Sequence, residues 1–202
     1  MTNSLSPLKI GVLALQGDFE RHLYHLERVG ANGREVRRSD DLETLDGLII
    51  PGGESTTMSE LIDRFDMRRK LREFCSRKAV WGTCAGMIML AREVDDARVR
   101  PLNIIDMTVR RNGYGRQVHS FHGTVKAALN GSHISLPASF IRAPVVTAYG
   151  RDVRVFARWN GSPVLLGKDR CLASSFHTEL DENPALLKYF LGYFAADSNS
   201  NP

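Results

Sequence analysis

The stretch Val80-Trp-Gly-Thr-Cys-Ala-Gly-Met87 decides the fold, because an apolar strand runs directly into a helix around a single cysteine. Gly82 and Gly86 stand two residues before and two residues after Cys84. Glycines at these positions remove side chains that would clash in a tight strand-to-helix turn, which is the nucleophile-elbow pattern with cysteine in place of serine. The pattern predicts that the Cys84 sulfur projects above one edge of a sheet.

The position of Cys84 at a helix N-terminus also predicts a reactive thiol, because the helix dipole favours the thiolate. A cysteine taken at random is more often a buried packing residue. The two flanking glycines reverse that expectation for Cys84. Cys75 and Cys171 have no such neighbours and are interpreted as packing residues.

A base and an acid for this nucleophile are found in Ser174-Ser-Phe-His-Thr-Glu179. Residues two apart on an extended segment point the same way, so Glu179 is expected to hold the His177 ring from behind. The alternative is a surface histidine beside an unrelated acid. The other histidines lack such an acid at a strand end and are interpreted as surface or partly packed residues: His22, His25, His119, His122 and His133.

A third motif, Pro51-Gly-Gly-Glu-Ser-Thr56, follows another apolar strand. Paired glycines let backbone N–H groups approach a substrate oxygen, as an oxyanion hole requires. Alone, two glycines after a strand usually indicate only a turn. All three motifs follow strands, however, and open α/β sheets build their sites at strand ends.

Outward from these motifs, the first half of the chain alternates between apolar strands and helices, which predicts an α/β sheet with right-handed crossovers. Ser55 is a candidate N-cap for the second helix. The predicted strands are residues 9–15, 35–38, 47–50 and 79–82, and the predicted helices are residues 19–29, 55–75 and 85–93.

From about residue 104 the segments are strand-like with few helices between them, which favours antiparallel additions to the sheet. We expect a three-layer α/β/α fold whose central sheet is mostly parallel. The length of 202 residues favours one domain, 1–202, with a core of about 8–196 and short flexible ends. The later predicted strands are residues 107–109, 117–125, 140–142, 153–159, 163–166 and 171–176, before a helix at 184–195.

Composition excludes several classes of protein. Apolar residues make up 43% and charged residues 25%, which is ordinary for a globular chain. The net charge of +4 comes from basic residues scattered among acids, so no nucleic-acid partner is predicted. Three cysteines without zinc-ligand spacing predict reduced thiols, a cytoplasmic location and no metal or other cofactor. No apolar stretch approaches the ~20 residues of a membrane span.

Taken together, the motifs resemble those of the class I, or triad, glutamine amidotransferases, whose fold is flavodoxin-like. More closely, the chain resembles the PdxT family, the glutaminase subunits of pyridoxal 5′-phosphate synthase. The likeness covers nearly the whole chain in order, which is more specific than any one motif. It is carried by Gly11-Val-Leu-Ala-Leu-Gln-Gly-Asp18, Pro51-Gly-Gly-Glu-Ser-Thr-Thr-Met58, Gly82-Thr-Cys-Ala-Gly86, Val109-Arg-Arg-Asn112, Phe140-Ile-Arg-Ala-Pro144 and Ser175-Phe-His-Thr-Glu179.

This resemblance implies hydrolysis of L-glutamine by a triad of Cys84, His177 and Glu179. It further implies an oxyanion hole built from backbone N–H groups of Gly53 and Ala85. The implied glutamine-binding residues are Gly53, Glu54, Ser55, Arg111, Ile141 and Arg142, with Gln16 near the mouth of the site.

Physical chemistry supports the implied charged contacts. An arginine can pair with the α-carboxylate of glutamine, and Glu54 can receive its ammonium group. For either residue in isolation, a surface salt bridge is the simpler interpretation. The chain departs from the family at Thr178, where proline is frequent, and at His119 and His122, where acids are common.

The resemblance also implies a partner, a PdxS-type synthase built as a (β/α) barrel. That enzyme combines ammonia with ribose 5-phosphate and glyceraldehyde 3-phosphate. The alternatives are a glutaminase subunit of another amidotransferase, such as imidazole glycerol phosphate synthase, a thiol hydrolase of γ-glutamyl peptides, or a non-catalytic regulatory subunit. The intact set of Cys84, His177 and Glu179 argues against the last of these.

Overall fold

The computed structural model describes residues 8–113 and 120–195, without the side chains of the last three. The expected flexible ends, His119 and the first residues of the strand predicted at 117–125 lie outside these ranges. The strands are β1 (Lys9–Leu13), β2 (Asn32–Val36), β3 (Gly47–Ile50), β4 (Ala79–Thr83), β5 (Ala91–Val94), β6 (Ile105–Arg110), β7 (Ser120–Leu129), β8 (Ser132–Ile141), β9 (Val145–Tyr149), β10 (Arg154–Trp159), β11 (Ser162–Lys168) and β12 (Cys171–Ser174). The helices are α1 (Phe19–Arg28), the short 3-10 helix η1 (Ser39–Leu42), α2 (Ser55–Arg64), α3 (Arg68–Cys75), α4 (Ala85–Leu90), α5 (Ala185–Tyr189) and the π-helical η2 (Phe190–Ala195).

A nine-stranded sheet in the order β2-β1-β3-β4-β12-β11-β10-β7-β8 forms the centre of the fold. Its first five strands pair in parallel, and every later pairing from β12 to β8 is antiparallel. A second sheet has the order β5-β6-β9. The expected parallel core with antiparallel additions is therefore confirmed, and the carboxyl ends of β1, β3, β4 and β12 meet at one edge.

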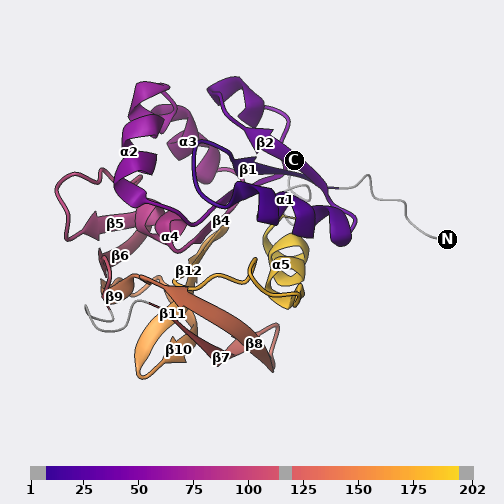
Figure 1. Cartoon of the computed structure of the whole chain (residues 1–202), viewed down its shortest axis with the longest axis vertical. Coiled ribbons are helices and arrows are strands. Elements are labelled where there is room, and N and C mark those ends of the chain that lie inside the picture. The colour runs from indigo at the N-terminus through magenta and orange to yellow at the C-terminus, as the bar shows by residue number, and fades with distance from the viewer. Residues whose placement is uncertain (1–7, 114–119, 196–202) are drawn as a thin grey trace.

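Helices cover both faces of the large sheet (Figure 1). Because successive strand residues point to opposite faces, β3 contributes to two separate cores. Leu48 and Ile50 pack in a core with residues of α2, α3 and α4. Ile49 packs in the other core, with residues of α1 and α5. This division is the three-layer α/β/α arrangement that the sequence predicts.

Two predicted helices are shorter than expected. The helix predicted at 55–75 is divided into α2 and α3, and Asp66 between them has a positive φ of 53°, which ends regular helix. The helix predicted at 85–93 ends at Leu90, because Ala91 turns into the extended backbone of β5. The N-cap of α2 is Glu54 rather than Ser55, since the Glu54 carboxylate accepts a hydrogen bond of 2.7 Å from the Thr57 N–H.

The antiparallel half contains more strand than the sequence pattern predicts. Strand β8 has ten residues where the pattern predicts only 140–142, and the pattern does not predict β9. Proline inside a run argues against a strand, and Pro137 stands in the middle of β8, although Leu136 and Ala138 beside it are buried.

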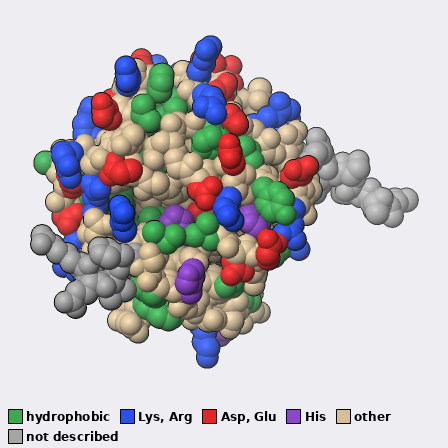
Figure 2. Space-filling model, viewed as in Figure 1, with side chains coloured by type: hydrophobic (Ala, Val, Ile, Leu, Met, Phe, Trp, Pro, Cys, Tyr) green, Lys and Arg blue, Asp and Glu red, His purple; other side chains and the backbone are tan. Residues whose placement is uncertain are grey.

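The visible face carries acidic and basic side chains intermixed, with no continuous basic stripe (Figure 2). None of the helices within residues 8–113 and 120–195 has the length and apolar character needed to cross a bilayer.

Replacing Gly86 with alanine tests the packing that sets the elbow. A Cβ at Gly86 would overlap the backbone carbonyl of Ile50 in the central strand β3, which cannot move without breaking the sheet. We expect Gly86→Ala to lower the free energy of unfolding by about 3 kcal/mol in urea titrations. Gly192→Ala is the matched control, because a Cβ there meets nothing within 4 Å. Equal stability of the two variants would contradict this account of the elbow.

The cap of α2 makes stability depend on pH. Burial by itself raises the pKa of Glu54, but hydrogen bonds from Thr56 and Thr57 outweigh burial and lower it from 4.5 to about 2. The ionised cap therefore stabilises the fold above pH 4.5 and is lost as pH falls towards 2.

We expect Glu54→Gln to cost about 1 kcal/mol of unfolding free energy at pH 7, because a side chain that is 45% exposed is partly screened. The difference from wild type should shrink when the urea titration is repeated at pH 3. Glu60→Gln, an exposed position on the same helix, is the control. A Glu54→Gln deficit that is the same at both pH values would rule out the ionised cap as its cause.

Candidate active site

Cys84 lies in the turn between β4 and α4, in a backbone conformation that non-glycine residues rarely adopt. Its φ is 48° and its ψ is −100°. The turn is fixed from two sides: the Cys84 N–H donates a 2.8 Å hydrogen bond to the Ser174 carbonyl, and the Ile88 N–H donates to the Cys84 carbonyl at 3.2 Å. A Cβ at Gly82 would lie 2.5 Å from the Gly86 backbone. The sequence therefore folds here as an elbow, and it presents the thiol at the carboxyl end of β4.

His177 and Glu179 lie just beyond β12, the parallel neighbour of β4. The distance from His177 Nδ1 to Glu179 Oε1 is 2.6 Å, and both residues are buried. Strand β8 holds the histidine backbone, because His177 N–H donates to the Ser139 carbonyl at 2.8 Å and Ser139 N–H donates back at 3.3 Å. The structure thus brings the predicted base and acid together beside Cys84.

The surroundings of Cys84, His177 and Glu179 favour a protonated imidazole beside an ionised carboxylate. Burial by itself lowers the pKa of His177, but hydrogen bonds to Cys84 and Glu179 outweigh burial and raise it. Burial raises the pKa of Glu179, but the charge of His22 and the hydrogen bond to His177 outweigh burial and lower it. A carboxylate that stays ionised next to a readily protonated imidazole is the arrangement that a thiol nucleophile requires.

The Gly52-Gly53 segment crosses above the histidine at the carboxyl end of β3. A Cβ at Gly52 would overlap the His177 ring, so only glycine allows this approach. Gly53 has a φ of 145°, and a Cβ there would lie 2.5 Å from Gln16 Oε1. The Gln16 side chain supports the segment directly, because its Oε1 accepts a 3.0 Å hydrogen bond from the Glu54 N–H.

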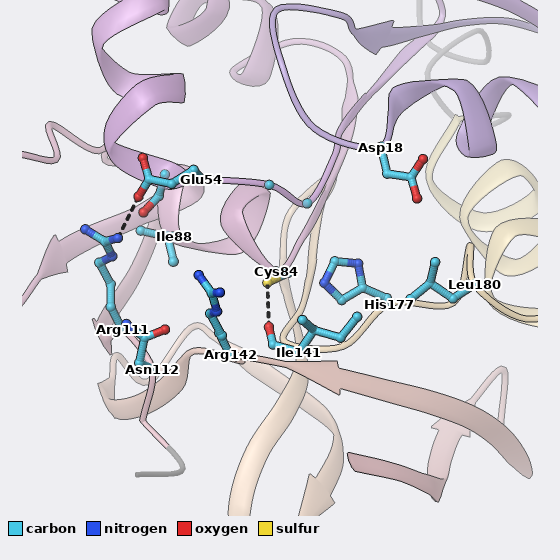
Figure 3. Close-up of a pocket in the computed structure, with 13 residues that line it drawn as sticks. Asp18, Glu54, Cys84, Ile88, Arg111, Asn112, Ile141, Arg142, His177 and Leu180 are labelled. Carbon is cyan, nitrogen blue, oxygen red and sulfur yellow. Dashed lines mark hydrogen bonds and ion pairs between the residues drawn. The ribbon is translucent and has the colours of Figure 1, made fainter. Parts of the chain in front are cut away.

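A cavity of about 410 Å³ opens in front of Cys84 (Figure 3). At its centre the Cys84 thiol faces the Ile141 carbonyl at 3.8 Å, and the Arg142 side chain reaches up beside it. Eight of the predicted site residues line this cavity, together with Asp18, Gly52, Ile88, Asn112 and Leu180: Gly53, Glu54, Ser55, Cys84, Arg111, Ile141, Arg142 and His177.

Three predicted site residues do not line the cavity. Glu179 lies behind His177 and is 2% exposed. Ala85 is buried at the start of α4. Gln16 lies against Gly53 and Glu54, which themselves line the cavity.

The end of the cavity away from His177 is strongly charged (Figure 3). Arg111 lies 2.7 Å from Glu54 Oε1 through one terminal nitrogen and 2.5 Å from Asp96 Oδ2 through the other. The Arg111 backbone N–H also donates to Asp95 Oδ1 at 2.9 Å. The sequence motifs do not point to Asp95 and Asp96, because these residues follow β5, a strand that the sequence pattern does not reveal.

The prediction that His22 and His25 are surface or partly packed residues is wrong. His22 is 3% exposed and His25 is 8% exposed, and both contact Glu179. The distances are 3.6 Å from His22 Nε2 to the carboxylate and 3.1 Å from His25 Nε2 to the backbone carbonyl. The helical spacing of the sequence could have predicted the burial of His22, since His22 lies three residues after Phe19 and four before Leu26 on the apolar face of α1.

The two described positions at which the chain departs from the family both lie close to His177. His122 Nδ1 lies 2.8 Å from the Ser139 hydroxyl, and the Ser139 backbone pairs with that of His177. Thr178 is buried between the histidine and the glutamate. Within the described residues, no group of three or more histidine, cysteine or acidic side chains is arranged to hold a metal ion.

Comparisons with known proteins agree with this geometry. A family model described as the SNO glutamine amidotransferase family matches residues 12–196. The pyridoxal 5′-phosphate synthase subunit PdxT of Dehalococcoides mccartyi is 45% identical over 188 residues, covering 91% of this chain and 96% of the relative. The PdxT subunit of Deinococcus radiodurans is 46% identical over 191 residues, covering 92% of this chain and 96% of the relative.

Solved structures show the same relationship. A crystal structure of a glutamine amidotransferase, 43% identical, superposes with a TM-score of 0.85 and covers 90% of this chain and 96% of its own. A putative GMP synthase component from Thermoplasma acidophilum, 17% identical, has a TM-score of 0.70 over 97% of this chain and 98% of its own, which shows a shared fold alone. From the match over residues 12–196 and the 45% identity to a relative that is covered over 96% of its length, the chain belongs to the SNO glutamine amidotransferase family, as a glutaminase subunit of the PdxT type.

Proposed function

We propose that Cys84, His177 and Glu179 form the triad with which this chain hydrolyses L-glutamine to L-glutamate and ammonia. The observation that carries the proposal is the placement of the thiol between a paired imidazole on one side and a charged cavity end on the other. A zwitterionic substrate with an amide at the end of its side chain matches both features. The charged end takes the α-amino and α-carboxylate groups, and the amide reaches the sulfur.

The reaction then proceeds in two steps. His177 accepts the Cys84 proton, the thiolate attacks the amide carbon, and His177 returns the proton to the departing nitrogen, which leaves as ammonia. Water, deprotonated by His177, next attacks the γ-glutamyl thioester and releases glutamate. We assign the oxyanion contacts to the backbone N–H groups of Gly53 and Ala85, each of which would contribute about 3 to 4 kcal/mol to the barrier reduction.

Glutamine recognition is assigned to residues at the charged end and along the cavity wall. Arg111 would pair with the α-carboxylate and Glu54 with the α-ammonium group. Both are already close together, so the substrate would enter between them. Gly53, Ser55, Ile141 and Arg142 would complete the binding surface through their backbone and side-chain polar groups.

We further propose that the ammonia passes to a PdxS-type synthase, a (β/α) barrel that makes pyridoxal 5′-phosphate from ribose 5-phosphate and glyceraldehyde 3-phosphate. Two observations support a separate acceptor: the relatives are named as subunits of a synthase, and the described cavity accounts for the glutaminase half of the reaction. The three free thiols Cys75, Cys84 and Cys171 fit a reducing, cytoplasmic setting for the complex.

Removal of the Cys84 thiol tests the catalytic assignment. We expect Cys84→Ala to lower the rate of glutamate release from glutamine by about ten-thousand-fold, because the covalent route is lost. Cys75→Ala is the matched control, because Cys75 is a buried residue at the end of α3 and does not line the cavity. Glutamine hydrolysis by Cys84→Ala at the wild-type rate would refute the triad and favour a regulatory role for the chain.

Dependence on the acceptor tests the proposed partner. Docking is expected to order the Gly52-Gly53 segment and raise glutamine turnover by about tenfold or more, a typical size for coupling between sites. The measurement compares glutamate release with and without a PdxS-type synthase. Pyridoxal phosphate formation with glutamine as the sole nitrogen source provides the second readout. Equal turnover with and without the synthase would contradict the coupling.

A further inference from the structure

The acid of the proposed triad is held in an unusual way. The Glu179 side chain is 1% exposed, so water does not stabilise its charge. Its Oε1 lies 2.6 Å from His177 Nδ1 and 3.6 Å from His22 Nε2. Its Oε2 is buried and has no hydrogen-bond partner among the described residues. One hydrogen bond offsets only part of the free energy that is lost when a carboxylate is buried. A second imidazole at 3.6 Å therefore contributes to keeping the Glu179 carboxylate ionised.

His22 is fixed in place by the strand that carries the nucleophile. Its ring meets Trp81 edge-on, with 5.9 Å between ring centroids and an interplanar angle of 79°. Its Nε2 also lies 3.4 Å from the Thr83 hydroxyl, one residue before Cys84. The same imidazole therefore contacts both the nucleophile strand and the carboxylate behind the base.

His25 adds a backbone anchor one turn further along α1. Its Nε2 lies 3.1 Å from the Glu179 main-chain carbonyl. Helix α1 thus contacts the triad acid twice, at its carboxylate through His22 and at its backbone through His25. Because the first contact reaches the charged group, His22 is the one of these two histidines that can affect the ionisation of the acid directly.

From these contacts we propose that His22 is a positioning residue of the active site, which keeps the Glu179 carboxylate ionised and directed at His177. The proposal rests on the catalytic triad proposed above and extends it by one residue. Without His22, the buried carboxylate would retain a proton at higher pH. A protonated Glu179 no longer stabilises the imidazolium of His177, and the Cys84 thiolate loses its counter-ion.

The pH dependence of Cys84 reactivity would reflect the charged and titratable groups that surround Glu179 and His177. Glu179 faces His177 from its own segment and both His22 and His25 from α1. His177 in turn lines the same cavity as Cys84, whose thiol raises the pKa of the imidazole. Loss of His22 should therefore move the acid limb of thiolate formation to higher pH, whereas a purely structural role would change only the amount of folded protein.

The test measures the rate at which iodoacetamide alkylates Cys84 in the isolated chain between pH 5 and pH 10, with the modified peptide quantified by mass. This readout needs neither glutamine nor a synthase. We expect His22→Leu to raise the midpoint of the alkylation profile by about one pH unit, the lower end of the effect of a nearby charge. His22→Gln, whose amide places an N–H near the position of Nε2, should shift the midpoint less.

The matched control is His133→Gln, because His133 is exposed on β8. The steady-state readout is glutamine hydrolysis, in which His22→Leu should lower kcat about tenfold with little change in KM. A folded His22→Leu variant whose alkylation profile coincides with that of wild type overturns the proposal. If His22→Leu fails to fold, His22→Gln alone decides it.

The two proposals remain distinguishable by this design. A shifted alkylation profile in a chain that does not hydrolyse glutamine even with a PdxS-type synthase present would support the role of His22 at Glu179 and refute the assigned reaction. An unshifted profile in a chain that hydrolyses glutamine would refute the role of His22 and leave the reaction in place.

Discussion

The structure depends on one tight turn, in which β4 passes into α4 through Cys84 with a positive φ. That turn is possible only because the backbone at Gly86 packs directly against the Ile50 carbonyl, so helix, nucleophile strand and the neighbouring strand β3 approach without side chains between them. The strain is offset by backbone hydrogen bonds, including the one from Cys84 N–H to Ser174. Since that bond joins β4 to β12, the same contact that shapes the elbow also sets the distance from the thiol to His177.

A second constraint acts behind the histidine, where a carboxylate is buried. Two parts of the fold supply polar contacts to the buried Glu179 carboxylate. The segment that follows β12 carries His177 on one side, and helix α1 carries His22 on the other. This arrangement explains why a helix so early in the chain matters to a residue so late in it. It also explains the two histidines on α1, because an apolar stripe alone would leave the carboxylate without any polar contact from that side.

Sequence reasoning predicted the parts of the site that depend on local geometry. The elbow at Cys84, the His177 and Glu179 pair and the Gly52-Gly53 segment each follow from a short motif, and the alternation of strands and helices placed them at one sheet edge. His22 and Asp96 could not be found in this way. His22 contacts Glu179, which is distant in the chain, and Asp96 follows β5, a strand that the sequence pattern does not predict. Strand β9 and most of β8 were missed for other reasons: Pro137 interrupts β8, which lies at the edge of its sheet, and β9 has only five residues, which become a strand by pairing with β6.

The charged end of the cavity bears on why an amino acid, rather than a simple amide, would be the substrate. Glu54 and Arg111 lie 2.7 Å apart across the cavity end, and Asp96 holds the second arm of the arginine. A ligand that separates Glu54 from Arg111 must replace an ion pair, and a neutral amide offers nothing in return. A zwitterion brings one charge for each partner, so one ion pair becomes two while the net charge of the site is unchanged. Meanwhile Asp96 keeps Arg111 in position, because its contact does not need to break. The selectivity of the proposed site therefore arises from the cost of opening this ion pair, which only a molecule with both an ammonium and a carboxylate group offsets.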